Sequence, residues 1–200
     1  MIRISEITVR LMGLALLAGL SAWAGPPAIC HPIEIGQAKS LPWSNGGDFK
    51  KGDPNYDLKR LTPDTLALLA PGTPVRVRME TMRRAALYST KDTRLALDLA
   101  SKLMARALSA EASGTPDAMA WFDAGYFVET LKQAALIYKF DMLSAEEKKS
   151  WVLRDDITGI DGFAWVQKAL HMRGDSPDIK FALSLIDYDR GKKRAVVASK

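Results

Sequence analysis

Apolar residues recur along much of the chain at the spacing of an amphipathic α-helix. In residues 74–88, Val75, Met79, Met82 and Ala86 lie three or four positions apart, and charged side chains line another side of the segment. This spacing predicts a helix that packs one apolar face against the protein interior. The same period predicts further helices over residues 93–112, 116–140, 144–153, 161–173 and 177–191.

Four helix starts share a hydroxyl residue followed by proline. These residues are Thr62, Thr73, Thr115 and Ser176. A hydroxyl at the N-cap accepts a hydrogen bond from a free backbone N–H, and proline suits the first turn because it has no N–H to leave unpaired. We therefore expect these four residues to cap the helices that follow them.

The segment 116–140 differs from the other predicted helices in its composition. Between Ala118 and Val128 its only charged residue is Asp123, and aromatic residues crowd both sides. A helix that is apolar all round is buried on all sides. We expect this segment to be the central and most buried helix of the protein.

Together these patterns predict an all-α fold with a helical domain over residues 62–191. Helices joined by short breaks run antiparallel as hairpins, which form either a compact bundle or a short helical-repeat stack of the α-solenoid kind. Ala-Trp pairs at residues 120–121 and 164–165 weakly resemble helical-repeat modules of the tetratricopeptide kind, although the residue signature of those modules is absent. The pattern leaves bundle and stack open.

Residues 25–61 have the composition of a loop. They are rich in Pro, Gly, Asn and Asp, which favour turns and interrupt helices. Apolar residues are spaced along the segment as anchors on another surface would be: Ile33, Ile35, Leu41, Trp43 and Tyr56. We expect an extended N-terminal strap that lies on the helical domain.

Residues 1–24 have the features of a signal peptide. Arg3 and Arg10 precede an uncharged apolar run over residues 11–20, and Ala22 and Ala24 supply the small residues of a cleavage site. The run is shorter than the roughly 20 apolar residues of a membrane span, which disfavours an uncleaved anchor. We expect cleavage after Ala24, no membrane span in the mature chain, and an extracytoplasmic location, either periplasmic or secreted.

The charge of the chain argues against nucleic acid as a partner. The formal net charge of +5 falls to +4 when the two arginines and one glutamate of residues 1–24 are removed, and part of the remainder lies in a basic tail at residues 192–200. This excess is modest for a protein that binds nucleic acid. The single cysteine, Cys30, excludes an internal disulfide.

No motif in the chain indicates a metal ion, a cofactor or a catalytic nucleophile. Residues 53–64 place acidic or amide side chains at several positions of a calcium loop, but Leu58 stands where the loop requires glycine. Cys30 and His31 lack the second cysteine of a haem attachment motif, since that position is Pro27. We therefore expect no metal site and no cofactor.

Asp123 is the most informative charged residue, because a carboxylate among aromatic side chains must be paired or become neutral. The residues considered as its partners are Arg83, Arg84 and Lys132. Two interpretations follow. In one, Asp123 forms a structural ion pair; in the other, it lines a pocket together with Tyr126 and Glu129.

A second candidate site is a basic stripe on the predicted helix over residues 74–88. Arg76, Arg83 and Arg84 lie on its polar side, and we expect them to be exposed. With no catalytic signature in the chain, the stripe favours an exported helical module that binds or scaffolds another protein or a peptide. The alternative is an extracytoplasmic enzyme or small-ligand-binding protein with a pocket near Asp123, and the oligomeric state stays open.

Overall fold

The structure, a computed structural model, describes residues 25–44, 52–139 and 159–187. These residues form helices and connecting segments without any strand, apart from one isolated bridge between Trp43 and Gly52. The helices are α2 (Pro27–Cys30), α3 (Leu61–Leu68), α4 (Val75–Ser89), α5 (Thr93–Ala112), α6 (Ala118–Lys139), α9 (Gly162–Arg173) and α10 (Pro177–Ile186), and a short 3-10 helix (Leu58–Arg60) precedes α3. The prediction of an all-α fold is confirmed for the described residues.

Several predictions fall outside this part of the chain. The signal peptide at residues 1–24, the helix at 144–153 and the basic tail at 192–200 all lie outside the described residues.

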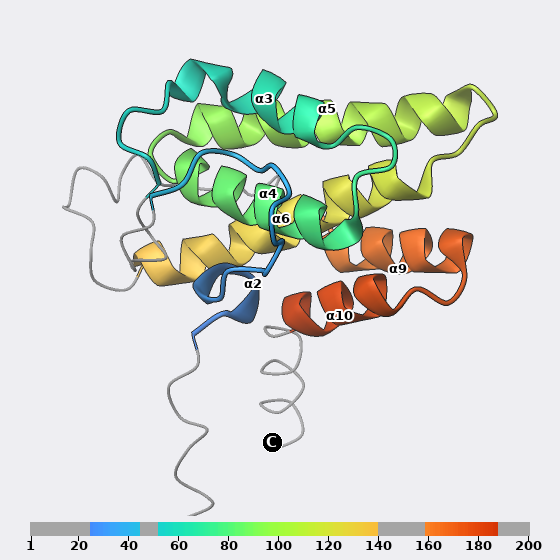
Figure 1. The fold of residues 1–200 in the computed structure, drawn as a ribbon. Coiled ribbons are helices and arrows are strands. Elements are labelled where there is room, and N and C mark those ends of the chain that lie inside the picture. The colour runs from blue at the N-terminus through green and yellow to red at the C-terminus, as the bar shows by residue number, and fades with distance from the viewer. Residues whose placement is uncertain (1–24, 45–51, 140–158, 188–200) are drawn as a thin grey trace, which may run out of the picture.

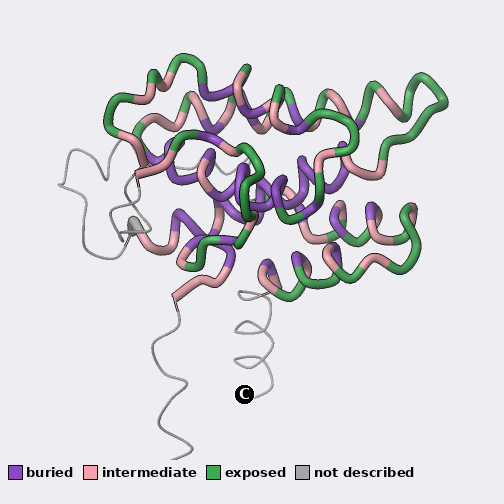
Figure 2. The backbone as a smooth tube through the Cα atoms, viewed as in Figure 1, coloured by how far each residue is buried: buried purple, intermediate pink, exposed green. Residues whose placement is uncertain are grey.

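Helix α6 runs through the middle of the molecule (Figure 1). It contacts α2, α4, α5, α9 and α10. Every residue from 120 to 131 is buried, and the buried part of the backbone is concentrated where α4 and α6 meet (Figure 2). The segment is central, as predicted, but it is not the most buried helix, because a larger share of the residues of α4 is buried. No helix in the described part of the chain, α6 included, is both long enough and apolar enough to cross a membrane.

The contact between α6 and α9 depends on two glycines. A Cβ atom on Gly125 would lie 2.4 Å from the carbonyl oxygen of Gly162, and a Cβ on Gly162 would lie 2.5 Å from the carbonyl oxygen of Gly125. Real Cβ atoms do not approach carbonyl oxygens this closely, so only glycine permits the observed separation of the two backbones. The closeness of this contact was not evident from the periodicity of either segment.

Residues 25–44, which we call the N-terminal segment, lie against α4 and α6. Ile29, Ile33 and Leu41 are buried. The Ala28 N–H donates to Gln133 Oε1 at 2.8 Å, and the Ile33 N–H donates to Glu80 Oε2 at 2.9 Å. Backbone groups that no helix or sheet satisfies are thus paired with buried side chains of the helices.

The predicted hydroxyl caps are largely wrong. Thr62 lies inside α3, and the hydroxyl of Ser176 makes no cap bond although Ser176 stands at the N-cap of α10. Aspartates cap α5, α6 and α9: Asp92 accepts from the Arg94 N–H, Asp117 from the Met119 N–H and Asp161 from the Ala164 N–H. A carboxylate is the stronger acceptor at a helix start because its charge also interacts with the positive end of the helix dipole.

Candidate functional site

Asp123 forms a buried ion pair with Arg78. Arg78 Nη1 lies 2.5 Å from Asp123 Oδ2, and each side chain is only 1% exposed. The same guanidinium donates from Nε to the Thr73 carbonyl at 2.9 Å and from Nη2 to the Ala70 carbonyl at 2.6 Å. Arg106 Nη1 lies farther away, 4.0 Å from the same Asp123 oxygen. The structural interpretation of Asp123 therefore has a definite partner.

That partner is not among the three residues considered from the sequence. Residues 78 and 83 are five positions apart, which turns Arg83 by about 140° from Arg78 around the axis of α4. Lys132 is nine positions from Asp123 on α6, so it projects to nearly the opposite side of that helix. Helical geometry thus directs Arg78 toward Asp123 and the other candidates away from it.

Burial controls the protonation of Asp123. Removal from water raises the pKa of Asp123 to about 7, although the charge and hydrogen bond of Arg78 oppose the rise. The second carboxyl oxygen, Oδ1, has no hydrogen-bond partner among the described residues. Asp123 is fully buried, so an external substrate has no direct access to it.

The predicted exposed stripe of arginines is wrong, because the N-terminal segment covers much of that side of α4. Arg83 is fully buried, and it donates to Glu80 from Nε at 2.7 Å and from Nη2 at 2.8 Å. Arg84 donates to Glu80 at 2.7 Å and to the Leu41 carbonyl at 2.6 Å. Arg76 alone of the three is well exposed, and it pairs with Asp178 of α10 at 2.9 Å.

Glu80 is the centre of this cluster. Burial alone would raise the pKa of Glu80, but hydrogen bonds and charge from Arg83, the Ile33 N–H and Arg84 outweigh it, so the pKa is lowered. Glu80 therefore stays ionised and links two arginines to the backbone of the N-terminal segment. The arrangement stabilises the fold and offers no open surface for a partner.

Tyr126 and Glu129 do not join Asp123 in a pocket. Tyr126 is fully buried, its ring stacks on Phe122 with a centroid distance of 5.5 Å, and burial raises the pKa of its hydroxyl. Glu129 pairs with Lys132 at 2.7 Å and lies against Gly162 of α9, whereas Asp123 faces α4. The pocket predicted from these three residues is absent from this part of the described structure.

An open groove lies between α3, α5 and the start of α6, and we call it the α3/α5 groove. Its volume is about 540 Å³. Two basic residues of α5, Lys102 and Arg106, line it together with the acidic residue Asp117. The rest of the lining consists of one leucine, three alanines and two serines, so the groove combines a partly apolar surface with charged side chains.

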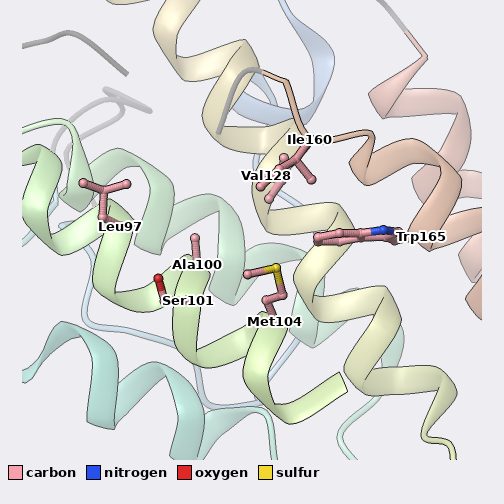
Figure 3. Close-up of a pocket in the computed structure, with 7 residues that line it drawn as sticks. All are labelled: Leu97, Ala100, Ser101, Met104, Val128, Ile160 and Trp165. Carbon is pink, nitrogen blue, oxygen red and sulfur yellow. The ribbon is translucent and has the colours of Figure 1, made fainter. Parts of the chain in front are cut away.

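A second hollow, the apolar pocket, lies between α5, α6 and the start of α9 (Figure 3). Its volume is about 130 Å³. The residues around it are Leu97, Ala100, Ser101, Met104, Val128, Ile160 and Trp165. Apart from the Ser101 hydroxyl and the Trp165 indole N–H, these side chains are apolar, so the pocket suits a small apolar group and presents no catalytic group.

No group of three or more metal-ligating side chains comes together in the described residues. The side chains of the weak calcium-loop pattern have other roles. Asp53 accepts from the Asn55 N–H, Asp57 accepts from the Lys59 N–H, and Asp64 binds Arg60. The first two are turn and cap contacts of the kind that aspartate ordinarily makes, and the third is an ion pair between residues four positions apart.

Arg78 was not among the candidate residues, although the sequence contains a signal for it. Arg78 lies three residues after Val75 and four before Met82, on the apolar face of the same helix. A positive charge on the buried face of one helix and a negative charge on the buried face of another would have suggested the Arg78–Asp123 pair. Lys102 and Arg106 belong to no motif that marks a groove, because the groove depends on how α3 packs beside α5.

The chain matches no protein-family model, and neither the curated proteins nor the solved structures contain a significant match to it.

Proposed function

We propose that this protein is an exported helical module that binds an extended segment of another protein. The single observation that carries the proposal is the α3/α5 groove, which is open, partly apolar and lined by Lys102 and Arg106. Peptide-binding grooves between helices have this combination of apolar surface and a few polar anchors.

The proposed architecture is a compact bundle of antiparallel hairpins held by an N-terminal strap. Short connections join α3 to α4 and α5 to α6, and α10 follows α9 after a few residues. The N-terminal segment would be the strap, since its backbone bonds to Glu80 and Gln133 attach it to two helices. A rigid bundle of this kind keeps the groove in shape before a partner arrives, which reduces the entropy lost on binding.

Export is supported by the signal-like residues 1–24. In the described structure, helix α2 begins at Pro27, directly after the expected cleavage point. Sequencing the N-terminus of protein recovered from the extracytoplasmic fraction should give Gly25 as the first residue. Recovery of Met1 on the exported protein would contradict this proposal.

A peptide library tests the binding function directly. Displayed peptides are selected on the wild-type protein, and each selected peptide is then measured against Ala105→Trp, which places a large ring in the groove. We expect selected peptides that lose at least tenfold in affinity for this variant. A matched control is Ala112→Trp, at the exposed end of the same helix, which should leave binding unchanged. If no peptide is sensitive to Ala105→Trp, the groove is not the binding site.

The apolar pocket favours a second candidate function, binding of a small apolar ligand. Filling the pocket by Ala100→Phe would abolish such binding, whereas Ala105→Trp would not affect it. Titration of both variants with an apolar fluorescent probe therefore separates the two candidate functions.

A further inference from the structure

We infer that the α3/α5 groove recognises an acidic peptide segment, with Arg106 binding a carboxylate directly and Lys102 supporting it. This inference deepens the proposed function and rests on it. It names the chemistry of the partner, which the shape of the groove alone does not specify.

Arg106 has hydrogen-bond donors that no described residue accepts from. A guanidinium carries five N–H donors. Arg78 uses its donors on the Thr73 and Ala70 carbonyls and on Asp123. Arg106 makes one long hydrogen bond, 3.5 Å from Nη2 to the Leu69 carbonyl, within the part of the chain that the structure describes. Because the Arg106 side chain is 33% exposed and lines the groove, its remaining donors can reach a ligand.

The charges that face the groove favour an acidic ligand. Asp123 Oδ2 lies 2.5 Å from Arg78 and 4.0 Å from Arg106, so Arg78 is its principal partner and Arg106 is only partly neutralised. Asp117, the acidic residue of the groove, accepts from the Met119 N–H at 2.8 Å and is thus engaged as the cap of α6. With two basic residues and one acidic residue, the groove lining presents a net charge of +1 to an incoming segment.

The two basic residues of the groove lie close together on one helix. Lys102 and Arg106 are four positions apart on α5, which places them on the same face one turn from each other. Lys102 is exposed and forms no ion pair with any residue that the structure describes. The long bond to Leu69 and the 4.0 Å contact with Asp123 restrain Arg106 only weakly, so its planar guanidinium can turn to a carboxylate and bind it through two N–H donors.

The experiment uses two labelled probes, N-acetylated and C-amidated hexaglutamate and hexaglutamine, and measures their binding to the full chain by fluorescence anisotropy. We expect hexaglutamate to bind at least tenfold more tightly than hexaglutamine. Arg106→Gln should weaken hexaglutamate binding about tenfold, because a charged hydrogen bond is lost. Lys102→Gln should weaken it less, and it serves as a second test because an exposed lysine is not needed for folding.

The matched control is Arg94→Gln. Arg94 lies on the same helix, but it pairs with Asp92 outside the groove, so its replacement removes the same net charge without touching the site. Circular dichroism of each variant shows whether the fold is retained. Equal losses for Arg94→Gln and Arg106→Gln would indicate general surface attraction and overturn the inference.

Different results would contradict the acidic specificity and the peptide-binding function. If hexaglutamine binds as well as hexaglutamate, and Ala105→Trp abolishes both while Arg106→Gln changes neither, the groove binds peptides but does not select carboxylates. If neither probe binds up to millimolar concentration, while library peptides still depend on the groove, the acidic specificity is likewise overturned. Loss of groove dependence for library peptides would overturn the proposed function itself.

Discussion

At the scale of single residues, the buried pair of Arg78 and Asp123 is especially sensitive to substitution. A buried ion pair contributes little net stability compared with apolar residues of similar volume, because desolvation of both charges opposes their attraction. Removal of one partner is different, since the other charge is left buried without compensation. The pair therefore predicts that single and double substitutions will not be additive.

The first prediction compares Arg78→Met with the double variant Arg78→Met/Asp123→Leu. At pH 8, where the carboxyl group is ionised, Arg78→Met should lower the free energy of unfolding by about 3 kcal/mol. The double variant should recover most of that loss. Urea denaturation measures both, with Arg94→Met as a control in an exposed pair. A double variant that is less stable than Arg78→Met would contradict this prediction. It would show that the loss in Arg78→Met does not come from an unpaired charge on Asp123.

The second prediction concerns pH. The pKa of Asp123 is raised from an ordinary value of 3.8 to about 7, so between these values the folded state holds a proton that the unfolded chain has released. The raised pKa thus stabilises the folded state fully below pH 4. Between about pH 4 and pH 7 the free energy of unfolding falls by on the order of 1 kcal/mol per pH unit, and above pH 7 this contribution is lost. Asp123→Asn should remove this slope from urea denaturation curves recorded between pH 5 and pH 8. An unchanged slope in Asp123→Asn would assign the titration to another group.

At this scale the sequence predicted that Asp123 matters but misidentified its partner. A charge within an aromatic helix is visible in the sequence alone, because few residue types carry a charge into a core. The partner depends on the rotation of α4 about its axis and on which face of α4 meets α6. Those quantities follow from packing, and the local period of the sequence does not contain them.

At the scale of helices, periodicity predicted α4, α5, α6, α9 and α10, whereas α2 and the 3-10 helix lie in residues 25–61, which were expected to form a loop. The predicted helix at 93–112 coincides with α5, and the predicted segment at 161–173 begins one residue before α9. Helix starts were less accurate: α6 begins at Ala118, two residues after the predicted start, because Asp117 and not Thr115 caps it. Two neighbouring acceptors compete at such a start, and the sequence does not reveal which one the backbone will meet.

The third prediction tests the contact between α6 and α9. Gly125→Ala places a Cβ atom 2.4 Å from the Gly162 carbonyl oxygen, so the helices must separate. We expect a loss of about 3 kcal/mol in the free energy of unfolding, the upper end of overpacking effects. Thermal or urea denaturation measures it.

A control separates this collision from ordinary backbone strain. Gly36→Ala has open space around its Cβ but a positive φ of 57°, so it should lose only about 1 kcal/mol. Comparable losses in both variants would show that the α6–α9 contact can relax.

At the scale of the whole molecule, the N-terminal segment determines which side of α4 is buried. Without it, Glu80 and the buried arginine Arg83 would form a charged face of α4 in contact with water. With it, that face is part of the interior, and the side chains bind the backbone of residues 29–41. This explains why the polar side of residues 74–88 was expected to be a surface: its amphipathic pattern is genuine, but a polar backbone segment covers it.

The fourth prediction uses amide hydrogen exchange to measure this attachment. The N–H of Ile33 donates to the Glu80 carboxylate in a buried setting, so it should exchange far more slowly than the N–H of Gly36, which lies in an exposed turn. Glu80→Gln retains an acceptor but removes the charge that Arg83 and Arg84 require. This variant should therefore raise the exchange rate at Ile33 at least tenfold. Unchanged exchange at Ile33 would show that the segment is held by its apolar contacts alone.

Gln133 has a consequence for the order in which the molecule can assemble. Its carbonyl oxygen accepts from the Ala28 N–H, 105 residues earlier in the chain, and its amide donates to the Leu185 carbonyl, 52 residues later. One side chain thus joins an early, a middle and a late part of the chain. Contacts between such distant residues form slowly, because the intervening chain must first become ordered. The junction at Gln133 can close only after Leu185 has been synthesised, so a ribosome-bound chain that lacks Leu185 keeps this buried amide half-paired.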